Sequence, residues 1–77
     1  MPCRVGITTD PDERKKYWDR HVVGMTNWTI LARYARREDA QAHETNAAQQ
    51  YGCQAHAGGS DAAGTWHVYY FKYTRTK

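Results

Sequence analysis

The sequence has no apolar run of about 20 residues, the length that a membrane-spanning helix needs, so we expect no membrane-embedded segment. It also has very few leucines and isoleucines, whereas three tryptophans and six tyrosines are present. Aromatic side chains must therefore supply much of the core, and their polar ends need hydrogen-bond partners where they are buried. The 77 residues predict one domain, residues 1–77, whose marginal stability would gain from a protein partner or a homodimer.

The two cysteines, Cys3 and Cys53, are too few and too far apart to predict a disulfide scaffold or a zinc site. We interpret them as buried or free thiols and therefore expect a reducing, cytoplasmic location. No phosphate-binding glycine loop, zinc-protease motif or nucleophile elbow occurs in the chain. The net charge of +3 permits nucleic-acid binding without requiring it, because the sequence has no basic arm or lysine run.

The N-terminal half begins with a predicted strand over residues 3–8, which is rich in β-branched side chains. A strong helix start follows, with Asp10 as the N-cap, Pro11 in the first helical position and Glu13 completing a capping box. The helix is predicted to run to about residue 22 and to end at Gly24. Helical spacing places four of its side chains on one face: Arg14, Tyr17, Trp18 and His21.

The rest of the chain predicts a second strand, a second helix and a last strand. Their expected ranges are 27–34, 36–51 and 65–74, with the helix ending at Gly52, a loop over 53–64 and a mobile tail over 74–77. The predicted fold class is α+β, a three-stranded sheet with two helices in the order β-α-β-α-β. Because a two-stranded sheet alone would be barely stable, we expect the aromatic last strand to pair with the first.

Two charged residues on the predicted helices are the main candidates for a functional site. Glu44 lies on an alanine-rich inner face, where a carboxylate is costly to bury unless it is paired or bound to a metal. It could hold Mg²⁺ together with water and substrate phosphate oxygens, or it could stay in solvent on a slightly rotated helix. Arg14 could bind a phosphate with both arms of its guanidinium, or it could be an ordinary surface cation.

Three further side chains are candidates to assist at this site. His21 lies two turns after Arg14 and could orient a nucleophile or carry a proton, although it could equally pack at the core margin. Tyr69 and Tyr70 lie on opposite faces of the last strand, so only one of them can face a cleft. Their hydroxyls could orient water or contact phosphate, and the alternative is a role as core aromatics.

The segment from Val5 to Arg14, VGITTDPDER, resembles the second signature strand, turn and helical arginine of the GIY-YIG nuclease superfamily. The segments WTIL at 28–31 and REDA at 37–40, with Glu44, resemble its third strand and its metal-binding helix. The resemblance covers roughly residues 4–59 and implies a minimal GIY-YIG-like domain. It also implies that Arg14 contacts phosphate and that Glu44 binds Mg²⁺.

The chain departs from the family pattern in two places. Arg4 replaces the tyrosine of the second signature, and no strand with the first signature precedes it. In the family those two strands form a hairpin, so the aromatic strand at 66–71 could take the place of the missing one in a circularly permuted relative. Tyr69 or Tyr70 would then restore a lost hydroxyl.

Two functions follow from these observations. One is a magnesium-dependent endonuclease in which Arg14 holds phosphate, Glu44 holds the metal, and His21 and a strand tyrosine assist water activation. The other is a catalytically inactive module that binds nucleic acid or a protein partner. The retained Arg14 and Glu44 favour the first function, whereas Arg4 and the small size of the chain favour the second.

Overall fold

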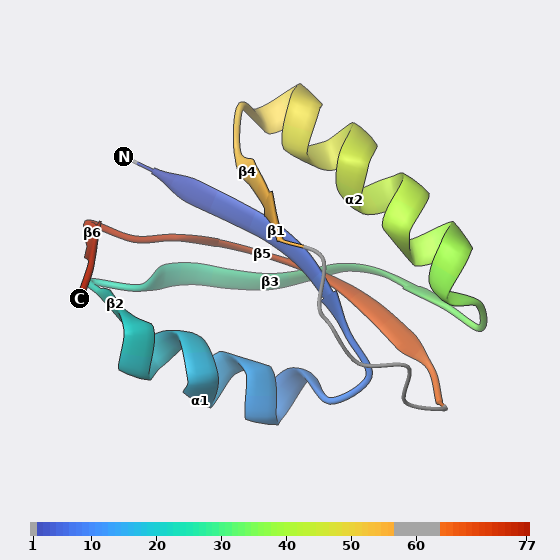
Figure 1. Ribbon diagram of the computed structural model, residues 1–77, viewed down its shortest axis with the longest axis horizontal. Coiled ribbons are helices and arrows are strands. Elements are labelled where there is room, and N and C mark those ends of the chain that lie inside the picture. The colour runs from blue at the N-terminus through green and yellow to red at the C-terminus, as the bar shows by residue number, and fades with distance from the viewer. Residues whose placement is uncertain (1, 57–63) are drawn as a thin grey trace.

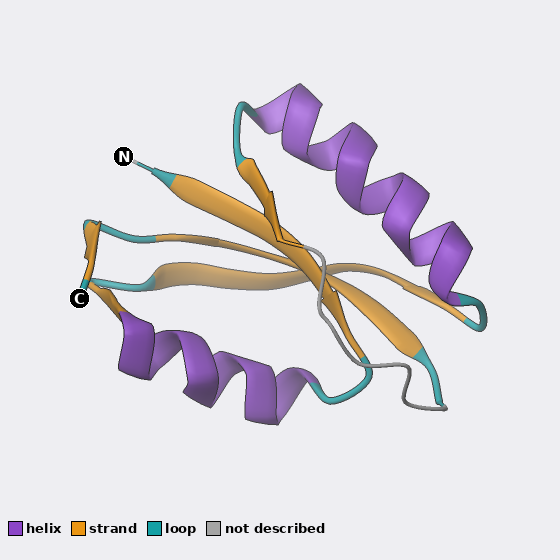
Figure 2. Ribbon diagram, in the orientation of Figure 1, coloured by secondary structure: helices purple, strands orange, loops and turns teal. Residues whose placement is uncertain are grey.

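The computed structural model of the chain describes residues 2–56 and 64–77 as an α+β fold with two helices (Figures 1 and 2). The elements of this described part are β1 (Cys3–Thr8), α1 (Pro11–His21), β2 (Val22–Val23), β3 (Thr26–Tyr34), α2 (Arg37–Tyr51), β4 (Gln54–His56), β5 (Trp66–Lys72) and β6 (Arg75–Thr76). The α+β class and both predicted helices are confirmed.

The main sheet has four strands in the order β3-β5-β1-β4. The central strand β5 is antiparallel to β1 on one side and to β3 on the other, with Tyr70 opposite Val5 and Tyr69 opposite Ile30. The predicted pairing of the last strand with the first is therefore confirmed. A hydrogen bond of 3.1 Å from the Tyr73 amide to the Pro2 carbonyl extends this pairing beyond the end of β5.

The prediction of a three-stranded sheet is wrong in its strand count. β4 lies within the segment expected to be a loop and pairs in parallel with β1. The predicted mobile tail is also ordered, because β6 pairs with β2 in a separate two-stranded sheet. Hydrogen bonds from the Thr74 amide to the Val23 carbonyl, 2.8 Å, and from the Lys77 amide to the His21 carbonyl, 2.9 Å, hold this tail in place.

Local sequence signals set the ends of both helices. The Asp10 side chain accepts a hydrogen bond of 3.1 Å from the Glu13 amide, as expected of an N-cap. α1 ends at His21 rather than near residue 22, because Val22 is already extended. α2 ends where predicted, since Gly52 adopts the left-handed conformation at φ 67°, which costs glycine little.

Apolar side chains form a layer on each face of the sheet, and the two helices cover opposite faces (Figure 1). The α2 side is mainly aliphatic, with Val5, Ile7 and Val68 packed against the alanines of the helix and with Trp66 in the same cluster. The α1 side is aromatic, with Trp18 packed in one buried cluster with Val22, Tyr69, Phe71 and Tyr73. The predicted aromatic core is therefore confirmed.

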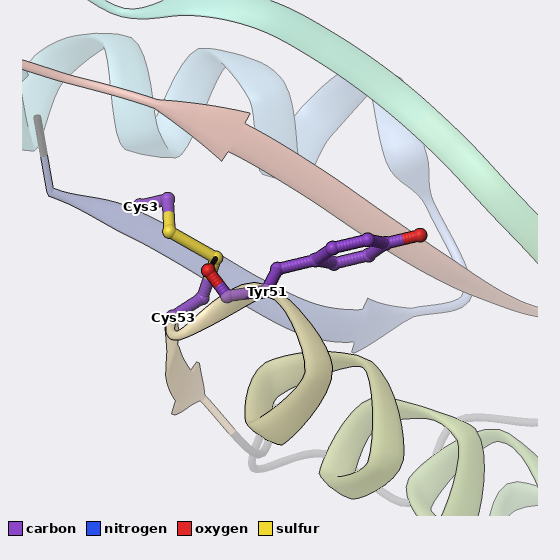
Figure 3. The surroundings of a disulfide bond; sticks show 3 residues. All are labelled: Cys3, Tyr51 and Cys53. Atoms are coloured by element: carbon purple, nitrogen blue, oxygen red, sulfur yellow. Dashed lines mark hydrogen bonds between the residues drawn. A yellow bond between two sulfur atoms is a disulfide. The ribbon is translucent and has the colours of Figure 1, made fainter.

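A disulfide joins Cys3 at the start of β1 to Cys53, directly after α2 (Figure 3). The two Cα atoms lie 4.9 Å apart, within the usual range for a disulfide. The prediction of free or buried thiols is wrong, because the parallel pairing of β4 with β1 brings together two cysteines separated by 50 residues. The cysteines therefore give no support to a reducing compartment.

Candidate functional site

Arg14 lies in the first half of α1, beside an open cavity of about 340 Å³ between the end of β1 and the helix. The cavity is lined by Thr8, Thr9, Asp10, Glu13, Arg14 and Tyr17. Arg14 is half-buried, and its Cζ atom lies 5.1 Å from the centroid of the Tyr17 ring. This contact holds the guanidinium over an aromatic face while it lines the cavity.

Two carboxylates also line this cavity, and one of them is engaged by the backbone. The Asp10 carboxylate accepts the hydrogen bond from the Glu13 amide, and the Thr8 hydroxyl accepts one of 3.1 Å from the Asp10 amide. No ion pair of Arg14 with either acid occurs among the described residues. The guanidinium therefore keeps its hydrogen-bond donors available to a ligand.

The aromatic side chains of α1 continue from Arg14 along the helix. The Tyr17 and His21 rings are stacked, with centroids 4.1 Å apart and an angle of 22° between their planes. His21 is exposed, and its Nδ1 donates a hydrogen bond of 2.6 Å to the Tyr17 carbonyl oxygen. Three of the four residues predicted to share a face form this stack, which we call the α1 face: Arg14, Tyr17 and His21. The fourth, Trp18, is instead buried in the aromatic layer.

Tyr69 is fully buried beneath α1, and its hydroxyl accepts a hydrogen bond of 2.9 Å from Nε1 of Trp18. Burial raises the pKa of Tyr69 above its ordinary value of 10.0, while the Trp18 bond and the charge of Arg14 act in the opposite direction. The charge of Glu44 adds a smaller upward contribution to this pKa. The hydroxyl therefore lies within electrostatic range of both predicted site residues, but it stays protonated at neutral pH.

Tyr70 lies on the opposite face of β5, as predicted. It is half-buried in the α2 layer, and its ring meets the Tyr51 ring edge to face at 5.6 Å. Tyr70 does not line the cavity beside Arg14. Of the two candidate tyrosines, Tyr69 is the one that shares a side of the sheet with Arg14.

Glu44 is buried on α2, with 2% of its surface exposed. The predicted inner-face position is confirmed, and the alternative of a solvated side chain is wrong. Glu44 does not line the cavity beside Arg14. Over residues 2–56 and 64–77, no group of three or more His, Cys, Asp or Glu side chains is placed to hold a metal ion. A magnesium ion at Glu44 would have to take its other oxygen ligands from water or substrate.

Arg4 on β1 packs into the aromatic layer on the α1 side of the sheet. Its Cζ atom lies 5.0 Å from the Trp18 ring centroid and 5.6 Å from that of Tyr73. The sequence marked this residue only as a departure from a pattern. In the structure it supplies a second guanidinium on the α1 side of the sheet.

A second cavity, of about 490 Å³, lies along α2. The side chains that give it its chemistry are Tyr34, Asp39, His43, Asn46, Gln50 and Tyr51, and we call it the α2 groove. Sequence reasoning missed this groove, although Asp39, His43, Asn46 and Gln50 follow helical spacing. A polar stripe of that kind is also what an ordinary solvent-facing helix carries.

Comparison of the chain with protein-family models, with curated proteins and with solved structures finds no match. Neither helix of the described chain has the length and apolar character that crossing a membrane requires.

Proposed function

We propose that this domain binds nucleic acid through the α1 face, with a phosphate at Arg14 and a base on the exposed ring of His21, which ends the stack on Tyr17. The observation that carries the proposal is the placement of Arg14. Its guanidinium lines an open cavity, lies over an aromatic ring and forms no ion pair within the described residues. A guanidinium with free donors can form two parallel N–H···O hydrogen bonds to the oxygens of one phosphate.

The spacing along α1 suits a strand of nucleic acid that follows the helix. Arg14 and His21 are seven residues apart, which is about 10 Å along a helix. Exposed aromatic rings stack on bases at about 1–3 kcal/mol per base, and this binding tolerates any base sequence. The cations Lys15, Lys16 and Arg20 are exposed on the same helix and would add salt-sensitive attraction to the phosphates.

The resemblance to GIY-YIG nucleases supports the same proposal. β5 pairs antiparallel with β1, as the first signature strand would pair with the second in a circularly permuted relative. Tyr69 on β5 lies within electrostatic range of Arg14 and Glu44, the two residues whose types match the family pattern. We include the permuted relationship in the proposal on these grounds.

The second candidate function is metal-dependent hydrolysis of a phosphodiester. Arg14, Glu44 and Tyr69 are the residues that favour it. Binding without cleavage is the better supported of the two. The Tyr69 hydroxyl is engaged by Trp18 and has a raised pKa, and Arg4 occupies the place of the second tyrosine. A single buried carboxylate fits a resident magnesium site poorly, so no step of the proposed binding depends on the ion.

The binding proposal is tested by fluorescence anisotropy with a labelled single strand and a labelled duplex over a range of salt concentrations. Arg14→Ala should weaken binding about tenfold, as loss of a charge-assisted contact worth about 1.4 kcal/mol would do. The matched control is Arg20→Ala, which removes an equal charge from an exposed position on the same helix. An equal loss of affinity in both variants would show that the attraction is non-specific. An affinity that does not change with salt concentration would refute phosphate contact.

Cleavage is tested with the same labelled strands in Mg²⁺ or Mn²⁺. If the wild type cuts either substrate, Glu44→Gln should abolish cutting, because the amide keeps the shape of the carboxylate and removes its charge. Cleavage that survives this substitution would exclude Glu44 as a metal ligand. Salt-sensitive binding without cleavage in the wild type would leave the binding module as the function.

A further inference from the structure

The α2 groove lies on the other side of the sheet from the α1 face and has a different chemistry. The described residues that line it include no lysine or arginine and a single carboxylate, that of Asp39, which is exposed. Asp39 forms no ion pair in the part of the chain that the structure describes. We propose that this groove binds an extended segment of a partner polypeptide and receives one of its arginine or lysine side chains.

A carboxylate beside an aromatic ring is a favourable environment for a cation with an alkyl stem. Tyr34 lies beside His43, one turn after Asp39, and supplies an aromatic face that attracts a guanidinium or ammonium group. Tyr51 lines the other end of the groove. Asp39 adds an opposite charge, and the side chains of Ala42 and Ala47 offer apolar contact for the stem. An anionic ligand would find no lysine or arginine among the described residues of the groove.

The two tyrosines are held in place before any ligand arrives. The Tyr34 hydroxyl lies 2.8 Å from Nδ1 of His43, and the two rings meet edge to face. Tyr51 is 51% exposed, yet its ring rests against Tyr70 and points away from the disulfide over the sheet (Figure 3). Side chains fixed in this way lose little conformational entropy on binding.

The shape of the groove favours a polypeptide over a small cation. The stripe from Asp39 to Gln50 is about 16 Å long, the length of about five residues in extended conformation. The Asn46 and Gln50 amides each offer a donor and an acceptor, which match the groups of a peptide backbone. Tyr34 belongs to β3, an edge strand of the sheet among the described residues, and an edge strand can pair with an added strand.

The charge of α2 disfavours nucleic acid at this groove. The helix carries three carboxylates, Glu38, Asp39 and Glu44, and one arginine, Arg37. α1 carries four cations and three carboxylates, so the two helices present opposite net charges on opposite sides of the sheet. The chain would then bind phosphate with one helix and a basic protein segment with the other.

The test is an NMR titration of isotope-labelled protein with two capped pentapeptides, acetyl-Thr-Val-Arg-Val-Thr-amide and the same peptide with glutamate in the centre. The arginine peptide should shift the amide signals of residues 39–51 and leave those of residues 11–21 unchanged. Asp39→Asn should weaken its binding about tenfold, because it removes the charge partner of the cation, and Tyr51→Ala should weaken it as well, because it removes an aromatic contact at the far end of the groove. The control is Asp12→Asn, which neutralises an exposed acid in the first turn of α1 and should leave binding unchanged.

Several outcomes would overturn the proposal. Equal affinity for the arginine and glutamate peptides would show that charge plays no role in binding. An equal loss of affinity in the Asp12→Asn and Asp39→Asn variants would show that the peptide does not bind in the groove. Tighter binding of free spermidine than of the arginine peptide at residues 39–51 would replace the polypeptide with a small cation. Shifts of the same residues by a labelled single strand of DNA would assign the groove to nucleic acid.

Discussion

Breaking the Cys3–Cys53 disulfide should cost this domain a large part of its stability. The bond closes a loop with a sequence separation of 50, and the chain-entropy model gives about 4 kcal/mol for a loop of that length. A domain of this size has a total unfolding free energy of about 4–12 kcal/mol. The reduced protein should therefore melt about 15–30 °C below the oxidised protein, because each kcal/mol shifts the melting temperature of a small domain by about 4–8 °C.

The assay is thermal unfolding by circular dichroism with and without a phosphine reductant, accompanied by thiol counting. The Cys3→Ser/Cys53→Ser double variant is the control. Its melting temperature should equal that of the reduced protein and should not change when the reductant is added. Two reactive thiols in the denatured, unreduced protein would show that the bond is absent. A reduced protein with two free thiols and an unchanged melting temperature would refute the stability argument.

Four other expectations concern the aromatic layer under α1. Trp18→Ala should lower the unfolding free energy by about 3–5 kcal/mol, because Trp18 is 5% exposed and fills this layer; an unshifted denaturant midpoint would contradict its role in the core. Trp18→Phe keeps a ring but removes the hydrogen bond to Tyr69, so ultraviolet titration should show the pKa of Tyr69 rising further, and an unchanged pKa would show that the bond does not reach the hydroxyl. Because the folded pKa of Tyr69 is raised, its contribution to stability is fully present below pH 10.0, the ordinary pKa, and is lost as pH rises above that value towards the folded pKa. Chemical denaturation at several alkaline pH values checks this, with Tyr69→Phe as the variant that should lose the dependence. Glu44→Gln should lower the pKa of Tyr69 and Arg14→Ala should raise it, and a pKa that responds to neither would place both charges out of range.

The sequence predicted those parts of the fold that depend on local signals or on strong composition. The Asp10 cap and Gly52 set helix ends because each acts on backbone groups within a few residues. The aromatic density of residues 66–71 predicted a core strand, and the structure places that strand at the centre of the sheet. These signals need no knowledge of distant partners.

The features that sequence missed depend on contacts between distant segments. β4 has only three residues, and β2 and β6 have two each, too short for an alternating pattern to be recognised. The disulfide depends on β4 lying beside β1, which the cysteine spacing does not indicate. The burial of Glu44 stayed open because sequence alone fixes the rotation of a helix only loosely.

The disulfide also gives the chain an unusual order of connection. Residues 3–53 form a covalent ring that contains β1 and β3, and β5, which lies between these two strands, comes from outside the ring. If the bond forms early in folding, β1 and β3 must stay about 10 Å apart, two interstrand spacings, until the aromatic strand enters between them. A single protease cut anywhere inside the ring would leave the two fragments covalently joined, so such a cut is visible on a gel only after reduction.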